Sequence, residues 1–338
     1  MRIRPTSLHL TLLGGLLGLR LSSSTLALFL PAVIGITVVR PSGNTVNRTP
    51  ELIFSATKNA TSVRQSVVIR NDQTTALTIT DIALSGADAA AFTVTNAPAL
   101  PLNLAPNDTA VVEIIFSPAG AVGALSAPLV ITGSSGAGAT IGLYGLSAQA
   151  LEGSNEPALD AIVQTLGYAV DVGGTQLILE KGPHPIGDEV LVPLFAQAGP
   201  GPVGMLPVAR YSPGGPLAYG YYVAEGDTVR TKEVGTVAGD QGQALNPALA
   251  AGTITFNPDG QSFGFYADVT SYAAQKTFTE DARNTGPLSH AVRTYPVKNR
   301  DGAAVANTYL VCIEPARNGD YQDYVFLVTN VKPAAERN

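Results

Sequence analysis

The sequence has few of the residues that carry out most protein chemistry. It holds one cysteine, no tryptophan and three histidines in 338 residues. A single cysteine excludes an intrachain disulfide. We expect Cys312, in the apolar run Tyr-Leu-Val-Cys-Ile, to be a small buried residue rather than a reactive thiol, because no basic neighbour would lower its pKa. The lack of a disulfide does not exclude export, since a chain of this length can build large cores without one.

Charge is also scarce. Charged residues make up 14% of the chain, the net charge is −6 and no run of Lys and Arg occurs, which argues against a nucleic-acid partner. The 35 glycines and 24 prolines follow no collagen period, a composition typical of many short strands joined by tight turns. The length suits two domains.

Catalytic motifs are missing as well. No zinc spacing, nucleophile elbow, P-loop or dinucleotide-binding glycine pattern occurs, so we expect a protein that is not an enzyme. His290, which enters an apolar segment, would be either a general base or a structural residue at a strand edge, and the second role is the ordinary one. Glu280 and Asp320 could in principle serve a glycosidase, but without tryptophan the stacking platform for a sugar would fall to Tyr and Phe.

Residues 1–40 resemble a targeting segment. Three arginines punctuate apolar stretches, and residues 21–39 carry no charge at all. This pattern predicts a signal peptide, or else a signal anchor that spans a bilayer once, which would be the only membrane contact. A third interpretation is an upstream start followed by a buried strand. Export is the interpretation we favour.

Residues 48–150 show the period-two pattern of a half-buried strand. Apolar residues alternate with polar ones around Leu52, Val67, Leu77, Val111 and Leu129, and turn clusters separate these segments by eight to twelve residues. Such spacing predicts a β-sandwich of about seven strands, the size of an Ig-like domain.

The same region resembles a known family. The ordered features are an opening Leu-Ile-Phe, Val-Ile-Arg-Asn before the first turn, the turn Leu-Ala-Pro-Asn-Asp-Thr, Ile-Ile-Phe-Ser-Pro and a closing Leu-Tyr-Gly-Leu. Together they resemble the Ig-like domain of the abnormal-spindle/hydin type, which bacterial secreted proteins carry as the choice-of-anchor D domain. The resemblance implies a spacer or binding module without catalytic residues, and it points to a bacterial source.

A short polar linker, residues 151–156, precedes the second predicted domain, residues 157–333. Leu159, Ile162, Val163 and Leu166 have helical spacing and predict one short helix. Strand-like segments separated by Gly/Pro turns then predict a larger sandwich of jelly-roll or lectin-like shape, all-β apart from that helix. These segments are 169–172, 176–179, 189–195, 203–211, 218–223, 252–256, 262–268, 290–297, 307–314 and 324–331.

The second domain also resembles a module of bacterial secreted and cell-surface proteins. The phrases that carry the resemblance include IGDEVLVPLFAQAG, SHAVRTYPVKNRDG and NTYLVCIEPARNGDYQDYVFLVTNVKP. Its terminal acidic loop is similar to that of DUF4114-type domains. The resemblance implies a location and an architecture, but no chemistry.

That acidic loop is the main candidate site. Glu314, Asn318, Asp320 and Asp323 surround Gly319 between two apolar strands, and oxygen donors around a glycine turn suit Ca²⁺. Glu280 and Asp281 form a second acidic loop that would supply outer ligands. The alternative is an Asp-rich turn whose carboxylates cap backbone amides and pair with Arg317 or Arg283.

Tyr219, Tyr221 and Tyr222 form a second candidate. They would line a face that binds a glycan or a protein, or they would fill the sandwich core, as would Phe263 and Phe265, whose alternation points both rings the same way.

These observations lead to one expectation and two alternatives. We expect a non-catalytic exported protein, with an Ig-like spacer and a binding or adhesion module. If the acidic loop binds Ca²⁺, the ion would have a structural role in this module. The protein would meet an extracellular protein or glycan at the cell surface. The alternatives are a secreted carbohydrate-binding or carbohydrate-active protein with its site in residues 156–333, and an intracellular Ig-like scaffold.

Overall fold

The computed structural model describes residues 34–38, 46–47, 50–136, 138–212, 214–226, 228–239, 243–270 and 275–335. Residues Ala32–Asn338 belong to one compact unit. Most of the predicted leader lies outside the described residues. None of the described helices is long and apolar enough to cross a bilayer.

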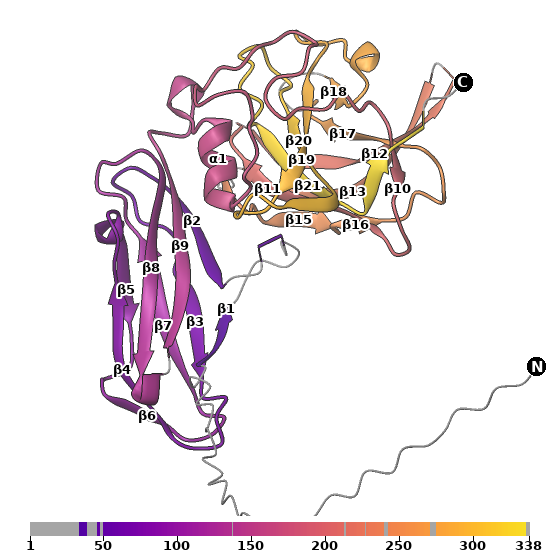
Figure 1. The fold of residues 1–338 in the computed structure, drawn as a ribbon. Coiled ribbons are helices and arrows are strands. Elements are labelled where there is room, and N and C mark those ends of the chain that lie inside the picture. The colour runs from indigo at the N-terminus through magenta and orange to yellow at the C-terminus, as the bar shows by residue number, and fades with distance from the viewer. Residues whose placement is uncertain are drawn as a thin grey trace, which may run out of the picture. The chain divides into compact units, whose positions relative to one another are not determined.

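The first half of the unit is an Ig-like β-sandwich, as the sequence predicted (Figure 1). Its two sheets pack on a core that includes Phe54, Phe92 and Phe116, whose rings contact one another. One sheet has the order β2 (Glu51–Thr57), β9 (Gly138–Ala148), β8 (Gly123–Gly133), β4 (Leu77–Leu84) and β6 (Leu102–Leu104). The other has the order β1 (Gly35–Val38), β3 (Gln65–Arg70), β7 (Thr109–Phe116) and β5 (Phe92–Asn96).

Strand β1 lies in the segment that the sequence assigned to the leader. It pairs antiparallel with β3, and Ile34 just before it is buried in the core. The apolar run of residues 21–39 therefore ends in a strand of the sandwich. This agrees, for residues 35–38, with the interpretation of the run as an upstream start followed by a buried strand. Any leader must end before Ile34.

The second half is also a sandwich of two antiparallel sheets. One sheet has the order β14 (Ala244–Leu245), β11 (Val203–Arg210), β21 (Tyr324–Thr329), β20 (Ala304–Ile313) and β19 (Val292–Lys298), with β16 (Thr255–Phe256) also paired to β11. The other has the order β15 (Leu249–Gly252), β13 (Thr228–Val237), β12 (Leu217–Glu225), β17 (Gly264–Asp268) and β18 (Lys276–Phe278). A small ribbon joins β10 (Phe195–Gln197) to β22 (Val331–Pro333).

The sheet that contains β20 and β21 is covered on both faces. Val311, Ile313, Phe326 and Val328 pack against the other sheet. Alternate residues, such as Leu310, Cys312, Val325 and Leu327, pack against the helix α1 (Leu159–Leu166). Strands buried on both faces carry an unbroken apolar run rather than an alternating one, as Leu-Val-Cys-Ile and Tyr-Val-Phe-Leu-Val do here.

Helix α1 confirms the predicted helix. Leu159, Ile162, Val163 and Leu166 are all buried, and Gly167 ends the helix with a φ of +80°, a conformation that glycine adopts without strain. Arg300 lies beside this end and donates to the carbonyls of Gln164 and Thr165. It also bonds Glu51 of β2 at 3.1 Å, and so links α1 to the first sandwich.

Some predicted strands do not form. Residues 169–172, 176–179 and 189–194 are extended or irregular, although Val170 and Val172 are buried beside α1. Ala169 and Val190 each donate one backbone bond to β19, to the carbonyls of Lys298 and Thr294, so these segments lie beside the strand without forming a ladder. Strand β13 was missed because its first half is exposed and carries Arg230, Lys232 and Glu233.

Gly145 tests the packing of the first sandwich. A Cβ at this position of β9 would lie 2.3 Å from Cε2 of the buried Phe116 ring. We predict that Gly145→Ala lowers the free energy of unfolding by about 1–3 kcal/mol, because the ring must shift in a filled core. Gly138→Ala in the same strand is the control, since its Cβ would meet its nearest atom at 3.6 Å. Urea unfolding of both variants is the measurement, and equal stability of the two would contradict the packing described.

Candidate functional site

The predicted acidic loop joins β20 to β21 and is buried. Glu314, Asp320 and Gln322 are fully buried and Asp323 is 5% exposed. Gly319 takes a φ of +81° at the sharp turn, as a loop glycine was expected to do. The loop is buried because the strands at its two ends are covered on both faces.

Glu314 organises the loop backbone. Its Oε1 accepts the amide of Ala316 at 2.8 Å, and its Oε2 accepts the amides of Asp320 at 2.9 Å and Tyr321 at 3.3 Å. Burial, and then the neighbouring carboxyl of Asp320, raises the pKa of Glu314 to about 8. For this one residue the structure supports the alternative interpretation, a carboxylate that caps backbone amides.

Asp320 joins the remaining side chains of the loop. Its Oδ2 accepts the Asn318 amide at 2.6 Å and the Gln322 amide at 3.0 Å. The same Gln322 nitrogen donates to Glu156 Oε2 at 2.6 Å. We call Glu156, Glu314, Asn318, Asp320, Gln322 and Asp323 the acidic cluster.

Sequence reasoning missed two members of this cluster. Gln322 was passed over between two aspartates, and Glu156 was placed in a polar linker, whereas it is only 9% exposed. Glu156 lies 166 positions before Gln322, so no local spacing could have revealed the contact. Burial, partly offset by the hydrogen bond from Gln322, raises the pKa of Glu156 to about 7.

The cluster concentrates negative charge. Burial, followed by the charges of Glu314, Asp320 and Glu156, raises the pKa of Asp323 well above its ordinary value of 3.8. Arg210 acts in the opposite direction on Asp323, and its guanidinium donates to the carbonyls of Ala238, Gly214 and Gly215. Arg210 thus compensates Asp323, one of the four buried carboxyl groups of the cluster.

The predicted outer ligands belong to other networks. Glu280 bonds Arg283 at 2.5 Å, and Asp281 bonds His290 Nδ1 at 3.0 Å. They are therefore not part of the acidic cluster. The glycosidase pair Glu280 and Asp320 is likewise divided between two separate hydrogen-bond networks.

His290 is held at both ring nitrogens. Its Nε2 meets Glu189 Oε1 at 2.9 Å and its Nδ1 meets Asp281. Glu189 also binds Arg293, whose guanidinium lies 4.6 Å over the Tyr321 ring. Burial opposes charge on the imidazole, but the hydrogen bonds to Glu189 and Asp281 outweigh it and raise the pKa of His290 above 6.5. The group is a closed salt-bridge network, with no spare nitrogen for a general base.

The prediction that Tyr219, Tyr221 and Tyr222 line a ligand-binding face is wrong, because these rings are buried. Tyr219 and Tyr222 are 0% exposed and Tyr221 is 4% exposed. Tyr221 stacks on Phe256 at a centroid distance of 4.1 Å, and Tyr222 shares a hydrogen bond with Thr279. Phe263 and Phe265 lie in the same core as Tyr219 and Tyr221, as their alternation predicted. Cys312 is buried too, and burial raises the pKa of its thiol.

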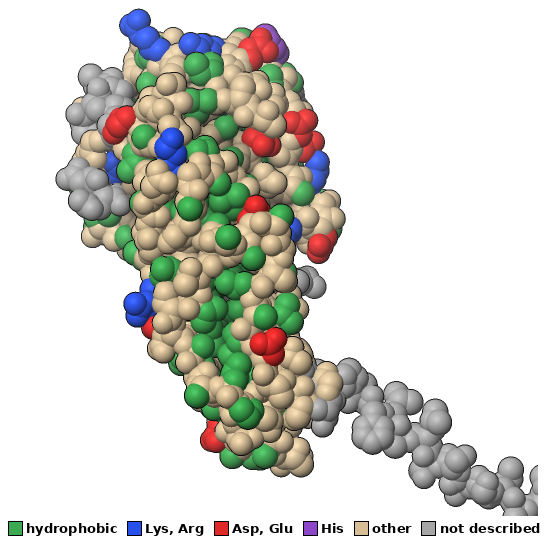
Figure 2. Space-filling model, turned by 90° about the vertical axis from the view of Figure 1, so that its left-hand side faces the viewer, with side chains coloured by type: hydrophobic (Ala, Val, Ile, Leu, Met, Phe, Trp, Pro, Cys, Tyr) green, Lys and Arg blue, Asp and Glu red, His purple; other side chains and the backbone are tan. Residues whose placement is uncertain are grey.

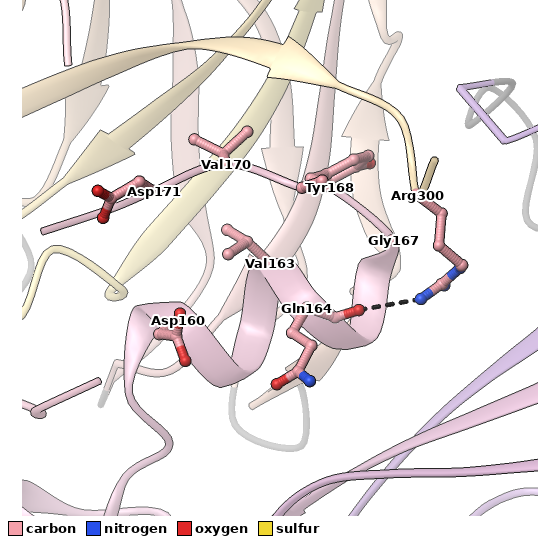
Figure 3. Close-up of a pocket in the computed structure, with 9 residues that line it drawn as sticks. Asp160, Val163, Gln164, Gly167, Tyr168, Val170, Asp171 and Arg300 are labelled. Atoms are coloured by element: carbon pink, nitrogen blue, oxygen red, sulfur yellow. Dashed lines mark hydrogen bonds between the residues drawn. The ribbon is translucent and has the colours of Figure 1, made fainter. Parts of the chain in front are cut away.

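An accessible groove runs along α1 (Figure 3). It has a volume of about 590 Å³, and its wall includes Asp160, Gln164, Tyr168, Asp171 and Arg300. Burial, and then the charge of Asp171, raises the pKa of Asp160. The Arg300 side chain reaches the helix end rather than the carboxylates, as its bond to the Gln164 carbonyl shows. The groove therefore offers carboxylates and an amide to a ligand.

Comparisons with known proteins add little. No family model and no curated protein matches the chain. Among solved structures, the VesB protease of Vibrio cholerae is 20% identical over 30% of this chain and 32% of its own, with a TM-score of 0.23.

Two further structures show the same level of likeness. An ASH/PapD-like domain of human CEP192 is 16% identical over 36% of this chain and 88% of its own, with a TM-score of 0.25. The secreted serine protease VesC of Vibrio cholerae is 12% identical over 90% of this chain and 51% of its own, with a TM-score of 0.27. The chain spans between a third and a half of the two Vibrio proteases, and likenesses of this size carry no argument about its function.

His290 gives a pH prediction whose sign follows from its raised pKa. The imidazolium stabilises the fold fully below pH 6.5, and this contribution is lost as the pH rises through the raised pKa of the folded state. We predict that His290→Gln lowers the free energy of unfolding by about 1–3 kcal/mol near pH 5.5, and by less near pH 8.5.

Urea unfolding of the wild type and the variant at both pH values measures this difference. Comparison with the wild type is needed because Glu156 and Glu314 titrate in the same range. His184→Gln is the control, since this ring is 61% exposed and pairs with Glu180 at the surface. A loss at His290 that did not change with pH would contradict the imidazolium assignment.

Proposed function

We propose that the chain is an exported, non-catalytic surface protein. The Ig-like sandwich would act as a spacer, and the second sandwich would act as a binding or adhesion module for an extracellular protein or glycan. The resemblance of residues 51–150 to the abnormal-spindle/hydin and choice-of-anchor D family supports the spacer role.

One observation carries the non-catalytic part of the proposal. The side chains of the second sandwich that could do chemistry are held by the fold. His290 bonds two carboxylates beside a small pocket, Cys312 lies in the core and Tyr222 bonds Thr279. A nucleophile or general base has to reach its substrate, so such groups serve the fold. The α1 groove is one of several cavities among the described residues that could take a ligand.

The surface supports the absence of a nucleic-acid partner. On the face drawn in Figure 2, Lys and Arg side chains are few and separated, and most of the area is uncharged. A nucleic-acid interface would need a continuous basic stripe to neutralise phosphates. A sparsely charged surface suits contacts with neutral ligands instead.

Export is tested with a reporter that is active only outside the cytoplasm. We predict that residues 1–33, fused to the reporter in a bacterium, give activity outside the cytoplasm, and that a fusion starting at residue 34 does not. This boundary preserves β1 in the mature sandwich. Retention of the first fusion in the cytoplasm would favour the intracellular scaffold.

A specific observation supports the carbohydrate alternative. The α1 groove presents Asp160, Gln164 and Asp171, and carboxylates and amides bond sugar hydroxyls well. The alternative predicts a glycan-array signal that Asp160→Asn with Asp171→Asn reduces at least tenfold, about 1.4 kcal/mol. Glu225→Gln, in an exposed ion pair with Arg230 on β12, is the control. Sugar release from the bound glycan would indicate a hydrolase, and no signal would favour a protein ligand.

A further inference from the structure

Three buried oxygens in the acidic cluster have no hydrogen-bond partner. They are Oδ1 of Asp320, Oε1 of Gln322 and Oδ1 of Asn318. Asp320 and Gln322 are fully buried, so water in the bulk does not reach these atoms. An unpartnered polar atom in a protein interior is costly, and three of them on neighbouring side chains need a common explanation.

Hydrogen bonds join the side chains that carry these oxygens. The Gln322 nitrogen bonds both Asp320 and Glu156, and the oxygen of the same planar amide lies on the same carbon. Asn318 donates to Asp320 in the same way. A 180° turn of either amide exchanges its nitrogen for its oxygen at little steric cost. Both amides would then direct oxygens at the Asp320 carboxylate, an arrangement that needs a cation between them or a proton on the carboxylate to stabilise it.

We propose that the acidic cluster is a Ca²⁺ site whose ligands are Asp320, Asn318, Gln322 and Glu156. Glu314 shapes the loop through its three backbone amides, and Asp323 adds charge close by. No three His, Cys, Asp or Glu side chains of the described residues already form a metal-ligand group. The proposed site therefore depends on the two amide oxygens as well as on two carboxylates.

The donor chemistry selects the ion. All the donors are carboxylate or amide oxygens on a loop that turns at a glycine, which is the environment that Ca²⁺ prefers. Mg²⁺ demands a small octahedral site and keeps several waters, for which this buried cluster has few openings. Zinc is disfavoured because the cluster holds neither Cys nor His.

Glu156 gives the site a structural role. It lies between β9 of the first sandwich and α1 of the second, whereas the other ligands lie in the β20–β21 loop. A shared ion would fasten the segment between the two sandwiches to the centre of the second one. The ion would thus stabilise the spacer together with the module.

The test is calorimetric melting of the full chain after treatment with EDTA and dialysis, with and without CaCl₂. We expect Ca²⁺ to raise the melting temperature by about 5–10 °C at a hundredfold excess over its dissociation constant. Asp320→Asn and Glu156→Gln should each remove most of this rise. Both should melt no lower than the wild type in EDTA, because each removes a buried charge.

Glu280→Gln is the matched control, since this acid lies in the Arg283 pair outside the cluster, and it should keep the full rise. Titration calorimetry of the wild-type chain should give one Ca²⁺ per chain. This measurement does not require either variant to fold. A wild-type melt that Ca²⁺ leaves unchanged would overturn the proposal. A rise in melting temperature that persists in both cluster variants would also overturn it, because it would indicate adventitious surface binding. An equal rise with MgCl₂ would overturn it as well.

Discussion

The burial of β20 and β21 on both faces is the constraint on which the second sandwich depends. One face of this strand pair carries the core between the two sheets, and the other carries the core beneath α1. The loop that joins the strands turns against the molecule, and Glu314, Asp320, Gln322 and Asp323 are buried with it, whereas Arg317 at its tip is exposed. The acidic cluster, the contact with Glu156 and the need to compensate charge all follow from that geometry.

Two buried charge networks near this loop differ in balance. Around His290, two acids face a histidine and an arginine, and each partner lies within hydrogen-bond distance of another. The network closes when the imidazole is protonated. In the acidic cluster, four carboxyl groups lie together, Arg210 acts on Asp323, and three oxygens lack hydrogen-bond partners. A buried charge without compensation is among the most expensive features a fold can hold, so the second network calls for protons or a cation.

The sequence predicted those parts of the structure that depend on short-range pattern. Period-two alternation around Leu52, Val67 and Leu77 predicted the first sandwich, and helical spacing from Leu159 to Leu166 predicted α1. The β20–β21 loop was singled out by composition, since its acids surround Gly319. Tyr219, Tyr221 and Tyr222 were also singled out, but their pattern fitted both a core and a ligand face. Their burial shows that they belong to the core.

What the sequence could not predict depends on long-range contacts. Glu156 in a polar segment, and Asp281 beside His290, take their roles from partners that the fold supplies. The extended segment 169–172 has the apolar residues of a strand. The structure shows that it makes a single backbone hydrogen bond to β19 and therefore does not pair with that sheet as a strand. Strand β13 is the opposite case. Its first half is charged and exposed and does not have the pattern of a strand, but its backbone pairs with β12 along its length.

In the proposed site, a cation compensates the buried carboxylates of the β20–β21 loop. The most direct measurement is a crystal structure of the full chain grown with CaCl₂, with data collected at a wavelength where calcium scatters anomalously. The account predicts one anomalous peak between Asp320 and Glu156, with the amide oxygens of Asn318 and Gln322 at about 2.3–2.6 Å from it. A map without that peak, in which the amides still donate their N–H groups to Asp320, would contradict the account and would leave shared protons to neutralise the cluster.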